Sequence, residues 1–98
     1  MRVPLLTEEE TAGHLARVSK WTRVGEAVSR TYRFGSFPAA IAFVVEVADA
    51  AEGMDHHPDI DVRYRNVTLR LTTHDVSGLT RLDFALAAAC DALAEEQK

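Results

Sequence analysis

The stretch Asp61–Thr73, which reads DVRYRNVTLRLTT, decides the fold. Its apolar side chains lie at even positions up to Tyr64 and at odd positions from Val67 onward. Alternate residues of a strand face opposite sides, so a single strand cannot switch faces in this way. A two-residue turn at Arg65-Asn66 resolves the conflict, because Tyr64 then opposes Val67 on the same face. The pattern predicts a β-hairpin whose buried face holds Val62, Tyr64, Val67, Leu69 and Leu71.

The residues after this hairpin predict a loop and a final helix. His74 has the opposite parity to the buried strand residues and lies at the strand end, and Ser77-Gly78 ends the strand. Thr80 has N-cap chemistry, and Asp83 follows at the third helical position. The predicted inward stripe is Leu82, Leu86, Ala89 and Leu93. Phe84, Ala88 and Cys90 make this helix apolar on more than one face, which favours a subunit interface there.

The residues before the hairpin predict a longer helix that ends in a histidine-containing loop. Ser36 can cap this helix, and Pro38 suits its first turn. Phe37, Ile41, Val44, Ala48 and Ala51 recur at helical spacing and predict the buried stripe. Gly53 is the expected C-cap, so Glu52 closes the helix. The chain then enters the loop Asp55-His56-His57-Pro58.

The first third of the chain predicts a short helix and a second hairpin. Thr7 and Glu10 have capping-box spacing, so we expect a helix over residues 8–18 with Ala12, Leu15 and Ala16 inward and His14 solvated. Gly25-Glu26 suits a two-residue turn that pairs Val24 with Ala27. Trp21 would then share a face with Val28, Arg30, Tyr32 and Phe34.

These elements follow one another as α-β-β-α-β-β-α. The order predicts an α+β fold, in which helices pack on one face of a four-stranded antiparallel sheet. The length of 98 residues suits a single domain over residues 1–98.

Composition excludes several classes of function. The net charge is −4 and the basic residues are scattered, which argues against nucleic-acid binding. No apolar run reaches 18 residues, so we expect no membrane span, and the first residues do not resemble a signal peptide. The single cysteine, Cys90, cannot form an internal disulfide. A cytoplasmic location is therefore the expectation.

The chemistry-bearing residues gather between Glu52 and Asp83. Three of the four histidines lie there, together with six carboxylates. Histidine is the side chain best suited to carry protons near neutral pH. Three histidines and a carboxylate could also hold zinc in a hydrolase, but adjacent histidines such as His56 and His57 rarely bind the same ion. The cluster therefore favours acid–base chemistry, with no metal and no cofactor.

The spacing of these residues resembles that of a known enzyme family. Glu52, His56-His57-Pro58, Tyr64, His74 and Asp83 together resemble the signature of the pterin-4a-carbinolamine dehydratases. The resemblance implies a hydro-lyase that removes water from 4a-hydroxytetrahydropterin and leaves quinonoid dihydropterin, in tetrahydropterin recycling. It also implies a homodimer or homotetramer, and an aromatic amino-acid hydroxylase as the pathway partner that supplies the substrate.

The resemblance also assigns roles to single residues. His57 would be the main acid or base, His56 and His74 would hold the hydroxyl, and Glu52 and Asp83 would orient the histidines. Asp55, Pro58, Thr73 and Trp21 would contribute to substrate binding. Three structural alternatives stay open: Asp83 as a plain helix cap, Trp21 as a core residue and Tyr64 as a core residue. Val76 stands where some relatives carry cysteine.

A different class of function is compatible with the same fold. The family includes dimerisation cofactors of a transcription factor and assembly chaperones of the carbon-fixing enzyme, so the alternative is a non-catalytic binding protein. The chaperone-type relatives lack the histidine set, whereas this chain keeps His56, His57 and His74. The histidines therefore favour the enzyme.

Overall fold

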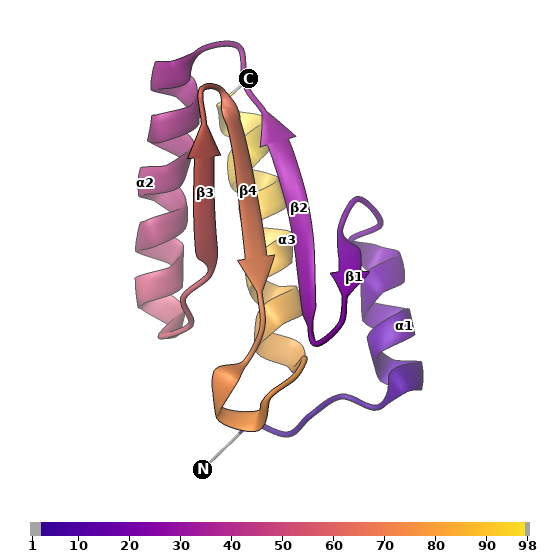
Figure 1. Ribbon diagram of the computed structural model, residues 1–98. Helices are drawn as coiled ribbons and strands as arrows, with labels where there is room; N and C mark the ends of the chain where they lie inside the picture. Colours follow the sequence, from indigo (N-terminus) through magenta and orange to yellow (C-terminus); the bar gives the residue numbers. More distant parts are fainter. Residues whose placement is uncertain (1–2, 98) are drawn as a thin grey trace.

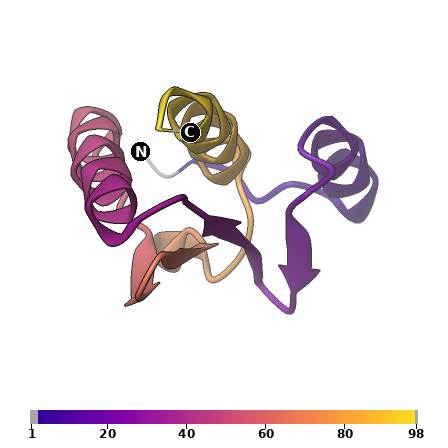
Figure 2. The same ribbon diagram turned by 90° about the horizontal axis from the view of Figure 1, so that it is seen from above.

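The protein folds into a four-stranded sheet with three helices on one of its faces (Figures 1 and 2). The computed structural model describes residues 3–97. The elements, in chain order, are α1 (Glu8–Arg17), β1 (Thr22–Val24), β2 (Ala27–Arg33), α2 (Phe37–Met54), β3 (Asp59–Arg63), β4 (Asn66–Leu71), the 3-10 turn η1 (His74–Val76) and α3 (Arg81–Glu96). The predicted α+β order is confirmed.

The sheet is antiparallel throughout, with strand order β1-β2-β4-β3. The first hairpin pairs Val24 with Ala27, as the sequence predicts. The central strands alternate as expected, with Val67, Leu69 and Leu71 fully buried. Arg30 is the one charged residue on the helix-covered face of β2, and its guanidinium lies 4.2 Å from the centre of the Tyr32 ring.

The second hairpin turns one residue earlier than predicted. Arg63 pairs with Asn66 and Val62 with Val67, so the turn residues are Tyr64-Arg65 and not Arg65-Asn66. Tyr64 has a φ of 53° and is 67% exposed, which corrects its expected place in the core. Val62 still faces the helices, because the pairing of Val62 with Val67 preserves the face.

The helix α2 buries a different stripe from the predicted one. Its buried residues are Ala40, Phe43, Val47 and Ala51. Of the predicted stripe only Ala51 is buried and Val44 is half-buried, whereas Phe37, Ile41 and Ala48 are exposed. The helix is apolar around most of its circumference, so periodicity alone could not identify the buried side. The predicted Gly53 cap is also wrong, since α2 continues to Met54 and Asp55 is the left-handed C-cap.

The helix α3 lies between α2 and α1 in the helix layer (Figure 2). Its buried residues are Asp83, Phe84, Leu86, Ala87, Cys90 and Ala94, whereas the predicted Leu82, Ala89 and Leu93 are half-buried. Phe84 stacks on His14 of α1, with ring centroids 5.1 Å apart, so His14 is not a fully solvated residue. Phe84 and Cys90 are buried within this one chain, whereas Ala88 is exposed, so the subunit surface expected on α3 stays a prediction.

The short helix α1 begins at the predicted residue, but the face that it buries differs from the predicted one. Thr7 and Glu10 form both hydrogen bonds of the capping box. Ala12 and Ala16 are exposed, Thr11 is buried, and Leu15 packs against the core. Alanine contributes little apolar area, so neighbouring side chains decided the orientation. No helix within residues 3–97 is long and apolar enough to cross a membrane.

Candidate active site

The three histidines meet at the end of the molecule where α2 stops and β4 runs into η1 (Figure 1). Residues from the two segments line a cleft of about 200 Å³. The lining residues are Asp55, His56, His57, Thr72, Thr73, His74 and Asp75. The fold therefore brings together His56, His57 and His74, together with Asp55 and Thr73 from the predicted binding set.

The end of α2 aims the two adjacent histidines in different directions. The left-handed Asp55 reverses the chain, and the His56 N–H bonds back to the Ala51 carbonyl at 3.0 Å. His56 thereby enters the interior and is 8% exposed. His57 stays outside, where 58% of its side chain is exposed. Half-buried Pro58 follows and leads into β3.

Each of these histidines has its own carboxylate. His56 Nε2 lies 2.6 Å from Asp83 Oδ1, and this pair is buried. His57 Nε2 lies 2.5 Å from Glu52 Oε1, in solvent. Glu52 stands in the last turn of α2, where the helix dipole disfavours an acid, so its partner His57 offsets an otherwise unfavourable position. Carboxylates placed in this way orient imidazole rings and select their tautomers.

Asp83 is fully buried and uses both of its oxygens. Its Oδ2 accepts hydrogen bonds from the Thr80 N–H and the Thr73 hydroxyl, each at 2.9 Å. Its Oδ1 faces His56. Asp83 therefore caps the helix and also contacts a histidine, so its two contacts are compatible in one side chain.

His74 reaches the cleft from the opposite segment. The N–H of Thr73 bonds to the Gly78 carbonyl at 2.9 Å and closes a tight loop around η1. The left-handed Ser77 completes this loop. His74 is exposed at the tip of this loop, and its imidazole has no hydrogen-bond partner among residues 3–97. Its imidazole is thus open to a ligand.

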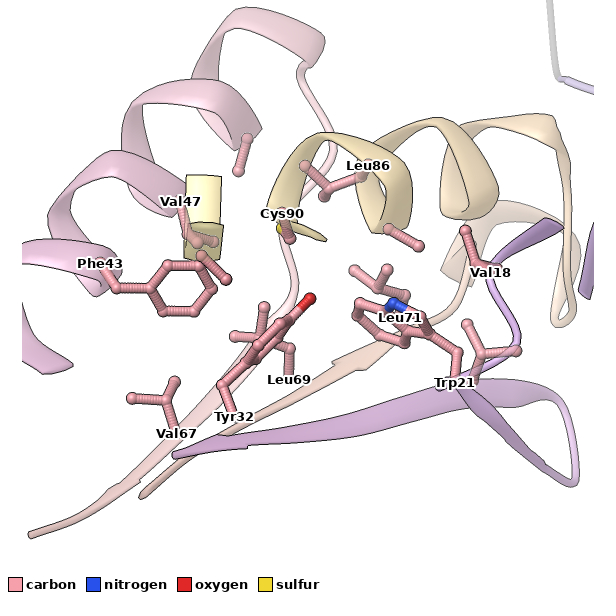
Figure 3. Packing of buried hydrophobic residues seen from close by; sticks show 14 of the residues in the cluster. Val18, Trp21, Tyr32, Phe43, Val47, Val67, Leu69, Leu71, Leu86 and Cys90 are labelled. Atoms are coloured by element: carbon pink, nitrogen blue, oxygen red, sulfur yellow. The ribbon is translucent and has the colours of Figure 1, made fainter. Parts of the chain in front are cut away.

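Trp21 does not line this cleft. It is 2% exposed and lies among Val18 and Leu71 in the core (Figure 3). Its indole Nε1–H donates to Asp91 Oδ1 at 3.0 Å, and the same oxygen accepts hydrogen bonds from Arg30 and from the Tyr32 hydroxyl. Within this structure Trp21 is a core residue, which is one of the two interpretations that the sequence left open.

A larger cavity, of about 380 Å³, lies elsewhere, between β2 and the end of α3. Lys20, Arg30, Arg33 and Asp91 are among its lining residues, and it has no histidine. Volume alone would favour this cavity as the binding site. We assign the candidate site to the smaller cleft because three histidines line it and two of them have carboxylate partners.

Sequence reasoning missed Thr72 and Asp75, which both line the cleft, and a second role of Thr80. Thr72 lines the cleft, but its hydroxyl donates to the Glu26 carbonyl at 2.6 Å, and no pattern indicated its position. Thr80 was interpreted only as a helix cap, although its hydroxyl also lies 2.8 Å from that of Thr73. The spacing of three residues between Thr80 and Asp83 could have indicated that Thr80 also belongs to the hydrogen bonds around Asp83.

Comparison with known proteins gives one consistent family. Residues 4–93 match the model described as pterin 4 alpha carbinolamine dehydratase. A Chloroflexus aurantiacus protein, provisionally named pterin-4-alpha-carbinolamine dehydratase, is 55% identical over 91% of this chain and 96% of its own length. A Nocardia farcinica protein with the same provisional name is 51% identical over 96% of this chain and 99% of its own.

Two solved structures share the fold. A Brucella melitensis protein, described as a transcriptional coactivator/pterin dehydratase, superimposes with a TM-score of 0.90 at 35% identity, over 93% of this chain and 99% of that one. A pterin dehydratase-like protein described as a RuBisCO assembly factor in the alpha-carboxysome superimposes with a TM-score of 0.64 at 27% identity, over 76% and 86% of the two chains.

Proposed function

This chain belongs to the pterin-4a-carbinolamine dehydratase family, and on that premise we propose that it dehydrates 4a-hydroxytetrahydropterin to quinonoid dihydropterin and water. The observation that supports the proposal best is the pair of histidine–carboxylate contacts at one cleft, His57 with Glu52 and His56 with Asp83. His74 adds a third imidazole to the same cleft.

The reaction requires an acid and a base near neutral pH. The C4a–oxygen bond breaks, the hydroxyl takes a proton and leaves as water, and a ring nitrogen gives up a proton. His57 suits the acid–base role because its side chain is the more exposed of the two adjacent histidines and Glu52 orients its ring. In this proposal His56 and His74 hold the hydroxyl, and Asp55 and Pro58 shape the loop beside them.

The test is the rate of dehydration of synthetic 4a-hydroxytetrahydropterin, followed by stopped-flow absorbance. We expect fast turnover that survives metal chelation and falls by about 10² or more in His57→Ala, since acid–base catalysis typically contributes 10²–10⁴. His14→Ala is the matched control, because His14 stacks on Phe84 outside the cleft. Wild-type turnover no faster than buffer would refute the proposal.

A binding function on the same fold is the second candidate. The similarity to a protein described as a RuBisCO assembly factor favours it. A binding function predicts that a stable complex with the partner persists in His57→Ala. The enzyme proposal predicts that His57→Ala loses dehydratase activity. Capture of the same partner by wild type and by His57→Ala, without turnover by either, would favour the binding function.

We also propose that copies of the chain associate through the outer face of α2. Phe37, Ile41 and Val45 are 48%, 37% and 56% exposed, and they lie along one side of the helix at a spacing of four residues. Sedimentation analysis should show a homodimer or homotetramer that dissociates in Val45→Lys. Val24→Lys, at an exposed position of β1 at the sheet edge remote from α2 (Figure 2), is the control. An unchanged mass in Val45→Lys would contradict this surface.

The physiological setting is part of the same proposal. An aromatic amino-acid hydroxylase would form the carbinolamine in the cytoplasm, and this chain would return the pterin to a recyclable form. The family assignment supports this setting. Accumulation of the carbinolamine when the gene is deleted in a hydroxylase-containing host would be the direct test.

A further inference from the structure

Thr73 lines the cleft, but its hydroxyl makes its hydrogen bonds to groups in the interior of the protein. Thr73 is 7% exposed. Its Oγ1 lies 2.9 Å from Asp83 Oδ2 and 2.8 Å from Thr80 Oγ1. A hydroxyl has one proton to donate, and both contacts of this hydroxyl are buried protein groups.

The donor and acceptor roles in this cluster follow from counting protons. Each hydroxyl has one proton, and an ionised carboxylate only accepts. The Thr80 hydroxyl oxygen already accepts the Leu82 N–H at 3.2 Å. If Thr73 gives its proton to Asp83 and Thr80 gives its proton to Thr73, every contact has one donor and one acceptor. The reverse order leaves the Thr80 proton without an acceptor among residues 3–97.

The same count extends to His56. Asp83 receives the Thr73 hydroxyl and the Thr80 N–H on Oδ2. A carboxylate that is ionised and surrounded by donors can only accept from His56, so Nε2 of the ring carries the proton of the 2.6 Å contact. Nδ1 is then the one ring nitrogen of His56 that can exchange a proton or accept a hydrogen bond from a ligand.

We propose that Thr73 is a positioning residue, which acts through Asp83 to hold the His56 ring in one orientation with Nδ1 available to the substrate hydroxyl. This inference rests on the proposed dehydratase function and deepens it. It changes the role of Thr73 from direct substrate binding to support of a histidine. Thr80 supports the same chain of hydrogen bonds, but it also caps α3, so Thr73 is the cleaner position to test.

The kinetic test compares Thr73→Val, which removes the hydroxyl at nearly constant volume, with Thr73→Ser, which keeps it. We expect kcat to fall about tenfold in Thr73→Val with KM within twofold, and Thr73→Ser to recover most of the loss. Thr68→Val is the matched control, because Thr68 and Thr31 form a similar 2.8 Å hydroxyl pair on the exposed face of the sheet. A raised KM with unchanged kcat, or no change at all, would overturn the proposal.

A spectroscopic test does not depend on turnover. In the wild-type protein labelled with ¹⁵N at histidine, long-range ¹H–¹⁵N spectra of neutral His56 should show a protonated Nε2 and a bare Nδ1. In Thr73→Val the ¹⁵N chemical shifts of both ring nitrogens should move toward the values of a mixture of the two tautomers. In Thr73→Ser and Thr68→Val these chemical shifts should stay as in the wild type. A wild-type ring protonated at Nδ1 would overturn the donor order. If the wild type lacks dehydratase activity, these spectra still decide the role of Thr73.

Discussion

At the scale of single residues, Asp83 is the group on which the interior end of the site depends. It is fully buried, and its partners belong to three segments: the loop after α2, the end of β4 and the start of α3. A buried carboxylate is tolerated only when hydrogen bonds replace its lost water. No buried side-chain nitrogen or oxygen within residues 3–97 lacks a partner, so this requirement is met.

The first residue-scale prediction concerns the stability that Asp83 provides. Asp83→Asn replaces one acceptor oxygen by an NH₂ donor that faces other donors. We expect the free energy of unfolding to fall by about 3 kcal/mol, as for other broken buried pairs. Urea denaturation measures this loss. Asp75→Asn, at an exposed acid of η1, should change the free energy of unfolding by less than about 0.5 kcal/mol. Equal effects of the two substitutions would contradict the argument.

At the scale of elements, the ends of α2 and of the second hairpin show how left-handed residues set geometry. Asp55, Tyr64 and Ser77 have φ values of 50°, 53° and 53°. Asp55 and Ser77 are the left-handed C-caps of α2 and η1, next to the two segments whose histidines line the cleft. Tyr64 lies in a turn away from the cleft, where the same conformation serves only to reverse the chain.

Tyr64 therefore offers a prediction about the hairpin alone. A left-handed conformation costs a bulky residue roughly 1–2 kcal/mol, and glycine avoids that cost. Glycine also loses more chain entropy on folding, so we expect a net gain of about 0.5 kcal/mol in Tyr64→Gly, measured by urea denaturation. Arg65→Gly is the control, because Arg65 has a negative φ, and it should destabilise the protein. A loss of stability in Tyr64→Gly would be inconsistent with strain at this turn.

At the scale of the whole molecule, the packing of the helices on the sheet buries two titratable side chains, Cys90 and Tyr32. The middle helix, α3, packs against the sheet and contacts both neighbouring helices, so Cys90 is fully buried. Burial raises the pKa of the Cys90 thiol to about 12. Burial and the neighbouring Asp91 also raise the pKa of the Tyr32 phenol. Both groups are therefore held neutral by the packed core.

These shifts predict that the protein loses stability in alkali. The unfolded chain releases the Cys90 proton near its ordinary pKa of 9.0, whereas the folded chain retains it. The contribution is complete below about pH 9 and is lost as the pH rises toward 12. The free energy of unfolding should fall by up to about 1.4 kcal/mol per pH unit for this group. Denaturation at pH 8–11 tests this, and the slope should be shallower in Cys90→Ala. An equal slope in both proteins would exclude Cys90 as the cause.

The sequence by itself determined the element order, the alternating faces of β2 and β4, and the capping boxes at Thr7 and Thr80. These features depend on contacts between residues a few positions apart, which local spacing reveals. The resemblance of the stretch from Glu52 to Asp83 to a known family assigned candidate roles to His56, His57 and His74, and the structure brings all three to one cleft.

Only the tertiary structure decided which helix faces are buried and which carboxylate serves which histidine. A helix that is apolar on several sides, such as α2, is oriented by its neighbours and not by its own period. The pairing of His56 with Asp83 joins residues 27 positions apart and exists only because α2 and α3 pack side by side. For the same reason, the inward turn of the Thr73 hydroxyl could not be foreseen from the residues around it.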